Sequence, residues 1–142
     1  CNKTTFLVSK RETQVSMKKY LFLALAWMLT SHVFSQAPSF SVTVEGKGNP
    51  VLFLPGFTTP GSVWNPTVQN LSSKKQSHLF TYAGFGGTAP IDTPWYASIK
   101  KELIAYIQKH KLSRITMIGH SMGGTLAIDL AAALPDKIDK LI

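Results

Sequence analysis

The chain has 142 residues, of which 44% are hydrophobic and 15% are charged, a balance that excludes a disordered chain and is typical of a globular one. Half of the net charge of +8 comes from the first 35 residues, where five basic residues face one acidic residue. The other basic residues are scattered, so we expect no nucleic-acid partner. The only cysteine, Cys1, excludes an intramolecular disulfide.

Residues 17–35 have the layout of a secretory signal peptide, with a basic start at Met17, an apolar run over 20–29 and a polar end. We expect cleavage after Ser35 and export to the periplasm or the extracellular space. The apolar run is shorter than the roughly 20 residues of a membrane span, which disfavours the alternative of an uncleaved anchor. Residues 1–16 fit no part of this design and are interpreted as upstream sequence without a structural role.

The rest of the chain alternates between strand and helix patterns. Residues 40–45 alternate apolar and polar side chains, which predicts a half-exposed strand. Residues 51–54 are continuously apolar and predict a buried parallel strand. After Thr93 and Pro94, apolar residues recur on one helical face, which predicts a helix that covers the sheet. Residues 125–134 are apolar nearly all round and predict a buried helix. Further predicted elements are a short helix over 64–71 and strands over 78–82, 114–118 and from 137 onwards.

This alternation indicates an α/β fold, a mostly parallel sheet flanked by helices, within residues 36–142. The sequence contains no metal-ligand cluster, no phosphate-binding lysine loop and no dinucleotide fingerprint. We therefore expect neither a metal nor a cofactor.

The most informative motif is Gly119-His120-Ser121-Met122-Gly123, which lies between an apolar strand pattern and a helix pattern. This is the context of the G-x-S-x-G nucleophile elbow, a sharp turn that exposes a serine hydroxyl. Glycines are needed at Gly119 and Gly123 because the strand and the helix approach each other closely, and the turn holds the serine in a strained backbone conformation.

On this motif, together with residues 52–57 and 82–87, the chain resembles the α/β-hydrolase family from about Phe40 to its last residue. The resemblance implies that Ser121 is a nucleophile and that the backbone N–H groups of Phe57 and Met122 form an oxyanion hole. Many relatives have a His-Gly pair where this chain has Pro55-Gly56. The departure leaves the subgroup open, and the same residues also fit an ordinary strand-ending turn.

The resemblance also implies an acid and a histidine that follow the serine in the chain. After Ser121 there is no histidine, and Asp129, Asp136 and Asp139 are interpreted as solvated surface acids. We therefore expect a fold truncated after the nucleophile helix, inactive by itself and poorly stable because its central strands would lack neighbours. A degenerate remnant and a non-catalytic binding module are the alternatives.

The expected function is an exported serine hydrolase that acts on a small-molecule ester or related acyl substrate through an acyl-enzyme. Peptidase, lipase, thioesterase and carbon–carbon hydrolase activities remain open. Dehalogenases and epoxide hydrolases of the family use a carboxylate nucleophile, so a serine disfavours both. Five aromatic residues in or near the loops around the serine are candidates for the lining of an apolar acyl pocket: Phe57, Trp64, Phe85, Trp95 and Tyr96. For Trp64 and Tyr96 the alternative is that they anchor their helices to the core.

Overall fold

The computed structural model describes residues 37–71, 75–92 and 94–142. The predictions about residues 1–16 and the signal peptide therefore lie outside the described residues, as does Thr93. In the part that is described, no helix is long and apolar enough to cross a membrane.

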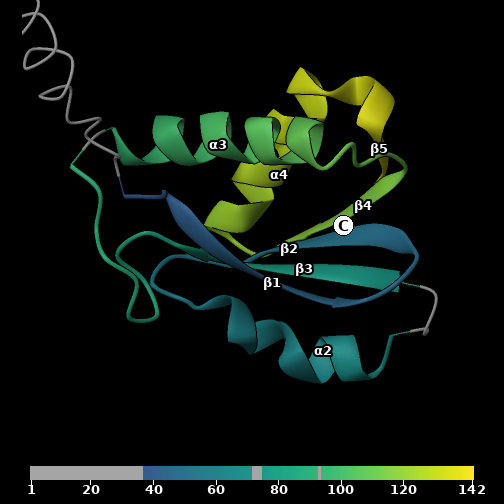
Figure 1. Ribbon diagram of the computed structural model, residues 1–142, viewed down its shortest axis with the longest axis horizontal. Coiled ribbons are helices and arrows are strands. Elements are labelled where there is room, and N and C mark those ends of the chain that lie inside the picture. The colour runs from purple at the N-terminus through teal and green to yellow at the C-terminus, as the bar shows by residue number, and fades with distance from the viewer. Residues whose placement is uncertain (1–36, 72–74, 93) are drawn as a thin grey trace, which may run out of the picture. The chain divides into compact units, whose positions relative to one another are not determined.

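The described residues form a five-stranded sheet with the order β1-β3-β2-β4-β5 (Figure 1). β1 (Phe40–Gly46) is antiparallel to β3 (Lys75–Tyr82), and all other pairs are parallel. β2 (Asn49–Leu54) lies between β3 and β4 (Ile115–Gly119), and β5 (Ile138–Leu141) pairs with β4. The predicted mostly parallel sheet is confirmed. The expectation that its central strands lack neighbours is wrong, because β3, β2 and β4 are each paired on both sides.

Helices cover both faces of this sheet. Figure 1 shows α3 (Trp95–Lys109) and α4 (Met122–Ala133) on one face and the short α2 (Asn65–Gln69) on the other. A 3-10 turn (Gly61–Trp64) leads into α2, and a second one (Pro135–Lys137) leads into β5. The predicted helix over 64–71 is therefore shorter than expected, with a 3-10 turn before it.

The two faces divide the side chains of β2 between two apolar clusters. Leu52 and Leu54 belong to the cluster beneath α3 and α4, whereas Val51 and Phe53 belong to the cluster on the α2 side. Successive side chains of a strand point to opposite faces, so a strand covered on both faces must be apolar throughout. This explains why residues 51–54 form a continuous apolar run.

The prediction that α4 is buried all round is wrong. Its buried residues are Gly123, Leu126, Ala127 and Leu130, whose spacing of three and four places them on one side of the helix. Ile128 on another side is 61% exposed. Sequence patterns did not show this exposure clearly, because apolar Ile128 and two alanines share the outer side of α4 with the polar residues Thr125 and Asp129.

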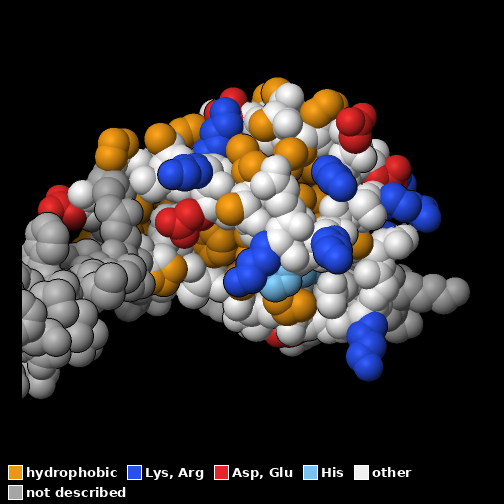
Figure 2. All heavy atoms as spheres, turned by 45° about the horizontal axis from the view of Figure 1, so that its top comes forward, with side chains coloured by type: hydrophobic (Ala, Val, Ile, Leu, Met, Phe, Trp, Pro, Cys, Tyr) orange, Lys and Arg blue, Asp and Glu red, His pale blue; other side chains and the backbone are white. Residues whose placement is uncertain are grey.

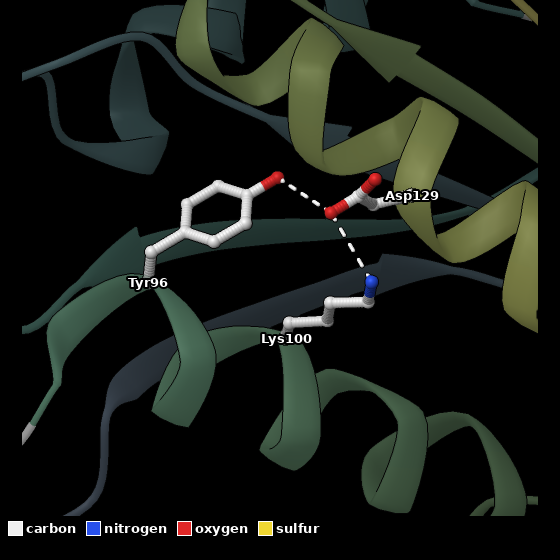
Figure 3. A network of polar contacts seen from close by, with 3 residues as sticks. All are labelled: Tyr96, Lys100 and Asp129. Atoms are coloured by element: carbon white, nitrogen blue, oxygen red, sulfur yellow. Dashed lines mark hydrogen bonds and ion pairs between the residues drawn. The ribbon is translucent and has the colours of Figure 1, made fainter.

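A polar network connects α3 to α4 (Figure 3). The Asp129 carboxylate on α4 accepts hydrogen bonds from the Tyr96 hydroxyl at 3.0 Å and from Lys100 Nζ at 3.1 Å. These bonds, the one from Lys100 foremost, lower the pKa of the Asp129 carboxyl. Asp129 is therefore a link between two helices rather than a purely solvated acid, whereas Asp136 and Asp139 are exposed.

Charged side chains of both signs are spread over the face shown in Figure 2, where neutral and hydrophobic surface separates the lysine and arginine side chains. Among the residues described, no group of three or more histidine, cysteine, aspartate or glutamate side chains could hold a metal ion. The functional site therefore has to be sought in the arrangement of the loops at the sheet edges.

Candidate active site

Ser121 lies in the turn between β4 and α4 and is exposed to solvent. Its backbone has φ 55° and ψ −119°, a combination that a residue with a side chain rarely adopts. The turn is closed by hydrogen bonds from the N–H groups of Gly123 and Gly124 to the carbonyls of His120 and Ser121, both 2.9 Å long. The backbone thus presents the Ser121 side chain at the carboxyl edge of the parallel sheet.

Two glycines permit this turn. A Cβ atom on Gly119 would lie 2.6 Å from the carbonyl oxygen of Gly123 and 2.6 Å from the Cα atom of Gly124. A Cβ atom on Gly123 would collide with the carbonyl oxygen of Leu54 and lie 2.6 Å from that of Pro55. Because the colliding atoms belong to the backbone, neither clash can be relieved by moving a side chain.

The loop that follows β2 lies directly against this turn. The His120 N–H donates to the carbonyl oxygen of Leu54 at 3.1 Å. A Cβ atom on Gly56 would lie 2.9 Å from His120 Nδ1, so the imidazole fills the space beside that glycine. The structure thus brings together the two segments that the sequence singled out separately.

The N–H groups of Phe57 and Met122 have no acceptor among the described residues. Met122 is the first residue of α4, so its N–H has no carbonyl within the helix to bind. Phe57 uses its carbonyl to accept the hydroxyls of Thr58 at 2.7 Å and Thr59 at 3.0 Å, while its N–H makes no such bond. Both donors are thus available to another partner.

Three of the five singled-out aromatic residues gather near this edge. Phe57 contacts Phe85 edge to face with ring centroids 5.2 Å apart, and Phe85 contacts Trp95 at 5.1 Å. Trp64 instead packs against Phe53 on the α2 side of the sheet at 5.4 Å. Tyr96 binds Asp129 of α4. The structure therefore assigns Trp64 and Tyr96 to packing between elements.

None of the described histidines is bonded to Ser121. His78 is buried in the sheet, where Nδ1 and the Tyr106 hydroxyl are 2.7 Å apart. Burial lowers the pKa of its imidazole to about 4, and the proximity of His110 adds to this shift. His110 follows the last residue of α3 and its ring contacts that of Tyr106 at a tilt of 42°, and His120 contacts Gly56. The described residues thus supply an exposed serine, two backbone N–H groups without an acceptor in the adjoining segments, and no histidine bonded to the serine.

Sequence reasoning did not find the His78–Tyr106 pair. The usable signal was the alternation along β3, since His78 shares its sheet face with Phe80 and Tyr82. A histidine in register with core residues requires polar partners, here Tyr106 of the covering helix and Gln76 of its own strand.

A mostly parallel sheet whose strand–helix turn exposes a serine in this strained conformation defines the α/β-hydrolase type of architecture. Comparison with known proteins agrees: the chain belongs to the alpha/beta hydrolase fold family, whose profile matches residues 49–142.

Among curated proteins, the chain is 29% identical over 98 residues to a pimeloyl-(acyl-carrier protein) methyl ester esterase of Aliivibrio salmonicida. This match covers 69% of the chain and 36% of the relative. It is 32% identical over 109 residues to the esterase of the same name from Aeromonas hydrophila, which covers 72% of the chain and 40% of the relative. The chain thus spans well under half the length of these relatives.

Among solved structures, the chain resembles an esterase from a marine microorganism with a TM-score of 0.66 and 30% identity, over 74% of the chain and 41% of that protein. It also resembles an epoxide hydrolase mutant from Vigna radiata with a TM-score of 0.64 and 26% identity, over 72% of the chain and 33% of that protein. Because one fold here hosts different chemistries, the reaction has to be argued from the site itself.

Proposed function

We propose that the protein is a serine hydrolase that cleaves a carboxylic ester or a related acyl bond through an acyl-enzyme. The single observation that carries this proposal is the exposed Ser121 in a strained turn whose glycines are required by backbone contacts. Strain of this kind persists only where the surrounding structure holds it, and it clusters at functional sites.

In the proposed reaction, Ser121 Oγ attacks the acyl carbon while a base takes the hydroxyl proton. The carbonyl oxygen becomes an oxyanion, which accepts hydrogen bonds from the N–H groups of Phe57 and Met122. The tetrahedral intermediate collapses to an ester on Ser121 and expels the alcohol, which receives the proton. Water then attacks the acyl-enzyme by the same route and releases the acid.

The described residues supply neither the histidine that would act as the base nor the acidic residue that would orient it. Support comes from the absence of a histidine bonded to Ser121 in those residues and from the 36–40% of the curated relatives' length that the match covers. We accordingly propose that the complete protein continues with a histidine and an acid, and that residues 36–142 expressed alone show no turnover.

Ser121 also favours acyl hydrolysis over the reactions of the dehalogenases and epoxide hydrolases that share the fold. Those enzymes use a carboxylate as nucleophile, and the serine at this turn cannot form the corresponding alkyl ester intermediate. The names of the esterase relatives point in the same direction.

The test is labelling of the full-length gene product with a fluorophosphonate probe, together with hydrolysis of p-nitrophenyl acetate. We expect both to be lost in Ser121→Ala and retained in Ser113→Ala, a matched variant at an exposed serine that precedes the opposite end of β4. A full-length product that folds but neither labels nor hydrolyses the ester would instead favour a non-catalytic binding module.

We further propose that the protein is exported and that its leader is removed near Ser35, on the basis of the pattern in residues 17–35. Amino-terminal sequencing of the exported product should give Gln36 as the first residue. A product that begins at Tyr20 or earlier would instead indicate an uncleaved anchor.

A further inference from the structure

The edge of the sheet that carries Ser121 has no lysine or arginine in its described loops, and a carboxylate lies against one of them, because Glu102 of α3 accepts the N–H of Ser39 at 3.0 Å. The described segments at this edge comprise residues 37–39, 55–60, 83–92 and 119–121. Among the lysine, arginine, aspartate and glutamate residues of the chain, only Asp92 lies in these segments. A substrate with a negatively charged group would therefore meet no lysine or arginine in these loops, and burying an unpaired charge is strongly unfavourable. This composition fits an uncharged substrate.

An exposed aromatic ring projects from the same edge. Phe57 is 67% exposed, although its ring contacts that of Phe85. It lies in the loop that contacts the Ser121 turn, next to Thr58, whose φ of 59° marks a sharp bend of the chain. Because Phe57 also offers its free N–H here, its ring and that donor are fixed to the same short stretch of backbone.

The position of the Phe57 ring depends on a second loop. Phe85, in the loop after β3, contacts the rings of both Phe57 and Trp95. This loop is itself tied down, because the Trp95 indole N–H donates to the carbonyl of Ala83 at 2.8 Å. The Thr88 hydroxyl donates at 2.7 Å to the carbonyl of Phe85. Phe85 therefore has a fixed position, and the Phe57 ring contacts it while most of the Phe57 side chain stays exposed to solvent.

We propose that the Phe57–Phe85 pair forms the wall that binds the apolar group of the substrate, and that the protein acts on uncharged esters with an apolar acyl chain. Phe57 contacts the chain, whereas Phe85 is a positioning residue that holds the Phe57 ring in the orientation the chain requires. This inference rests on the proposed function and adds its substrate class. The proposed contacts with the acyl chain are made by the Phe57 and Phe85 side chains. Both residues can therefore be replaced without removing the backbone N–H of residue 57.

The test compares p-nitrophenyl acetate, butyrate and hemisuccinate as substrates of the full-length protein. Each buried methylene contributes about a fourfold preference, so two extra methylenes predict roughly a fifteenfold higher kcat/KM for butyrate than for acetate. Phe57→Ala should reduce this ratio to near one, chiefly through KM for butyrate. The hemisuccinate, similar in length but anionic, should be at least about tenfold poorer than butyrate.

Phe85→Ala should reduce the butyrate-to-acetate ratio in part, and Phe85→Leu should restore most of it, since a positioning role needs bulk rather than an aromatic ring. Ile128→Ala, at a comparably exposed hydrophobic residue of α4, is the matched control and should leave the ratio unchanged. Fluorophosphonate labelling of each variant reports whether the turn is intact. If Phe57→Ala does not fold, Phe57→Thr takes its place, because it removes the apolar ring and adds no long apolar side chain.

The outcomes separate the two proposals. If the wild-type protein is labelled at Ser121 and the Phe57 variant keeps the same butyrate-to-acetate ratio, the proposed role of Phe57 in acyl binding is wrong. The proposal of a serine hydrolase is then unaffected. Equal rates on butyrate and hemisuccinate overturn the uncharged substrate class. A wild-type protein that neither labels nor hydrolyses any of the esters overturns both.

Discussion

Gly123, the second residue of α4, lies directly against the carbonyl oxygen of Leu54, the last residue of β2. The same oxygen accepts the N–H of His120, so it is held in place from the side of the turn. A helix, a strand and the turn that carries Ser121 thus meet through backbone atoms.

Replacing Gly123 with alanine should therefore lower the free energy of unfolding by roughly 1–3 kcal/mol, because the new methyl group meets backbone that cannot move aside. Gly124→Ala is the matched control, since its Cβ atom would lie 3.6 Å from the nearest carbonyl oxygen and alanine favours a helix by up to about 1 kcal/mol. Urea denaturation of both variants gives the comparison. Equal stabilities would contradict the close contact.

Ser121 offers a second test. In a helix a variant with alanine is usually more stable than one with glycine, and the backbone conformation of Ser121 should reverse this order of stability. At φ 55° a side chain is strained, so Ser121→Gly should be more stable than Ser121→Ala by about 1 kcal/mol. At the exposed helical position Ala97, the change to glycine should instead lose about 1 kcal/mol. Thermal or urea unfolding measures both pairs, and the same sign at the two positions would argue against strain at Ser121.

His78 should make stability depend on pH. Its pKa falls from 6.5 to about 4 on folding, so the unfolded chain takes up a proton at a pH where the folded chain does not. The part of the free energy of unfolding that depends on His78 is fully present above pH 6.5. It is lost as the pH falls toward 4, by roughly 2–3 kcal/mol in total. Unfolding measured from pH 7 to pH 4 should show this slope.

In His78→Gln the slope should be much flatter, whereas His110→Gln, at an exposed histidine nearby, should keep most of it. A slope that is unchanged in His78→Gln would assign the pH dependence to other groups.

Two tyrosines of the same core should respond in opposite ways to loss of the hydroxyl. The Tyr82 hydroxyl is buried and has no hydrogen-bond partner among the described residues, and burial raises its pKa. Tyr82→Phe should therefore leave stability unchanged or raise it by up to about 1 kcal/mol. Tyr106→Phe removes the partner of buried His78 and should lose about 1–2 kcal/mol. Thermal denaturation of the two variants checks the contrast, and a loss in Tyr82→Phe would reveal a partner of that hydroxyl.

The sequence predicted the sheet and the turn because their signals are local. The continuous apolar run in β2 and the one-sided apolar face of α3 reflect burial that each element experiences by itself. The glycines of the Ser121 turn stand out because no other residue fits between the backbones that meet there. Such constraints act on single positions and are visible without knowledge of distant neighbours.

Contacts between distant elements could not be predicted in this way. Asp129 has the local pattern of a surface acid, and its partners Tyr96 and Lys100 lie about thirty residues earlier on another helix. The exposure of Ile128 depends on what covers that side of α4, which the residue types do not state. The grouping of Phe57 with Phe85 follows from the sheet order, which brings the ends of β2 and β3 side by side.

The Ser121 turn is held by main-chain contacts, whereas Phe57 and Phe85 meet only through their rings. Mutations that exchange those rings leave every backbone contact of the turn in place. During divergence from a common ancestor, one lineage can therefore acquire a new preference among acyl groups while it inherits the same reaction. The turn would stay nearly invariant across such a lineage, and Phe57 and Phe85 would vary together.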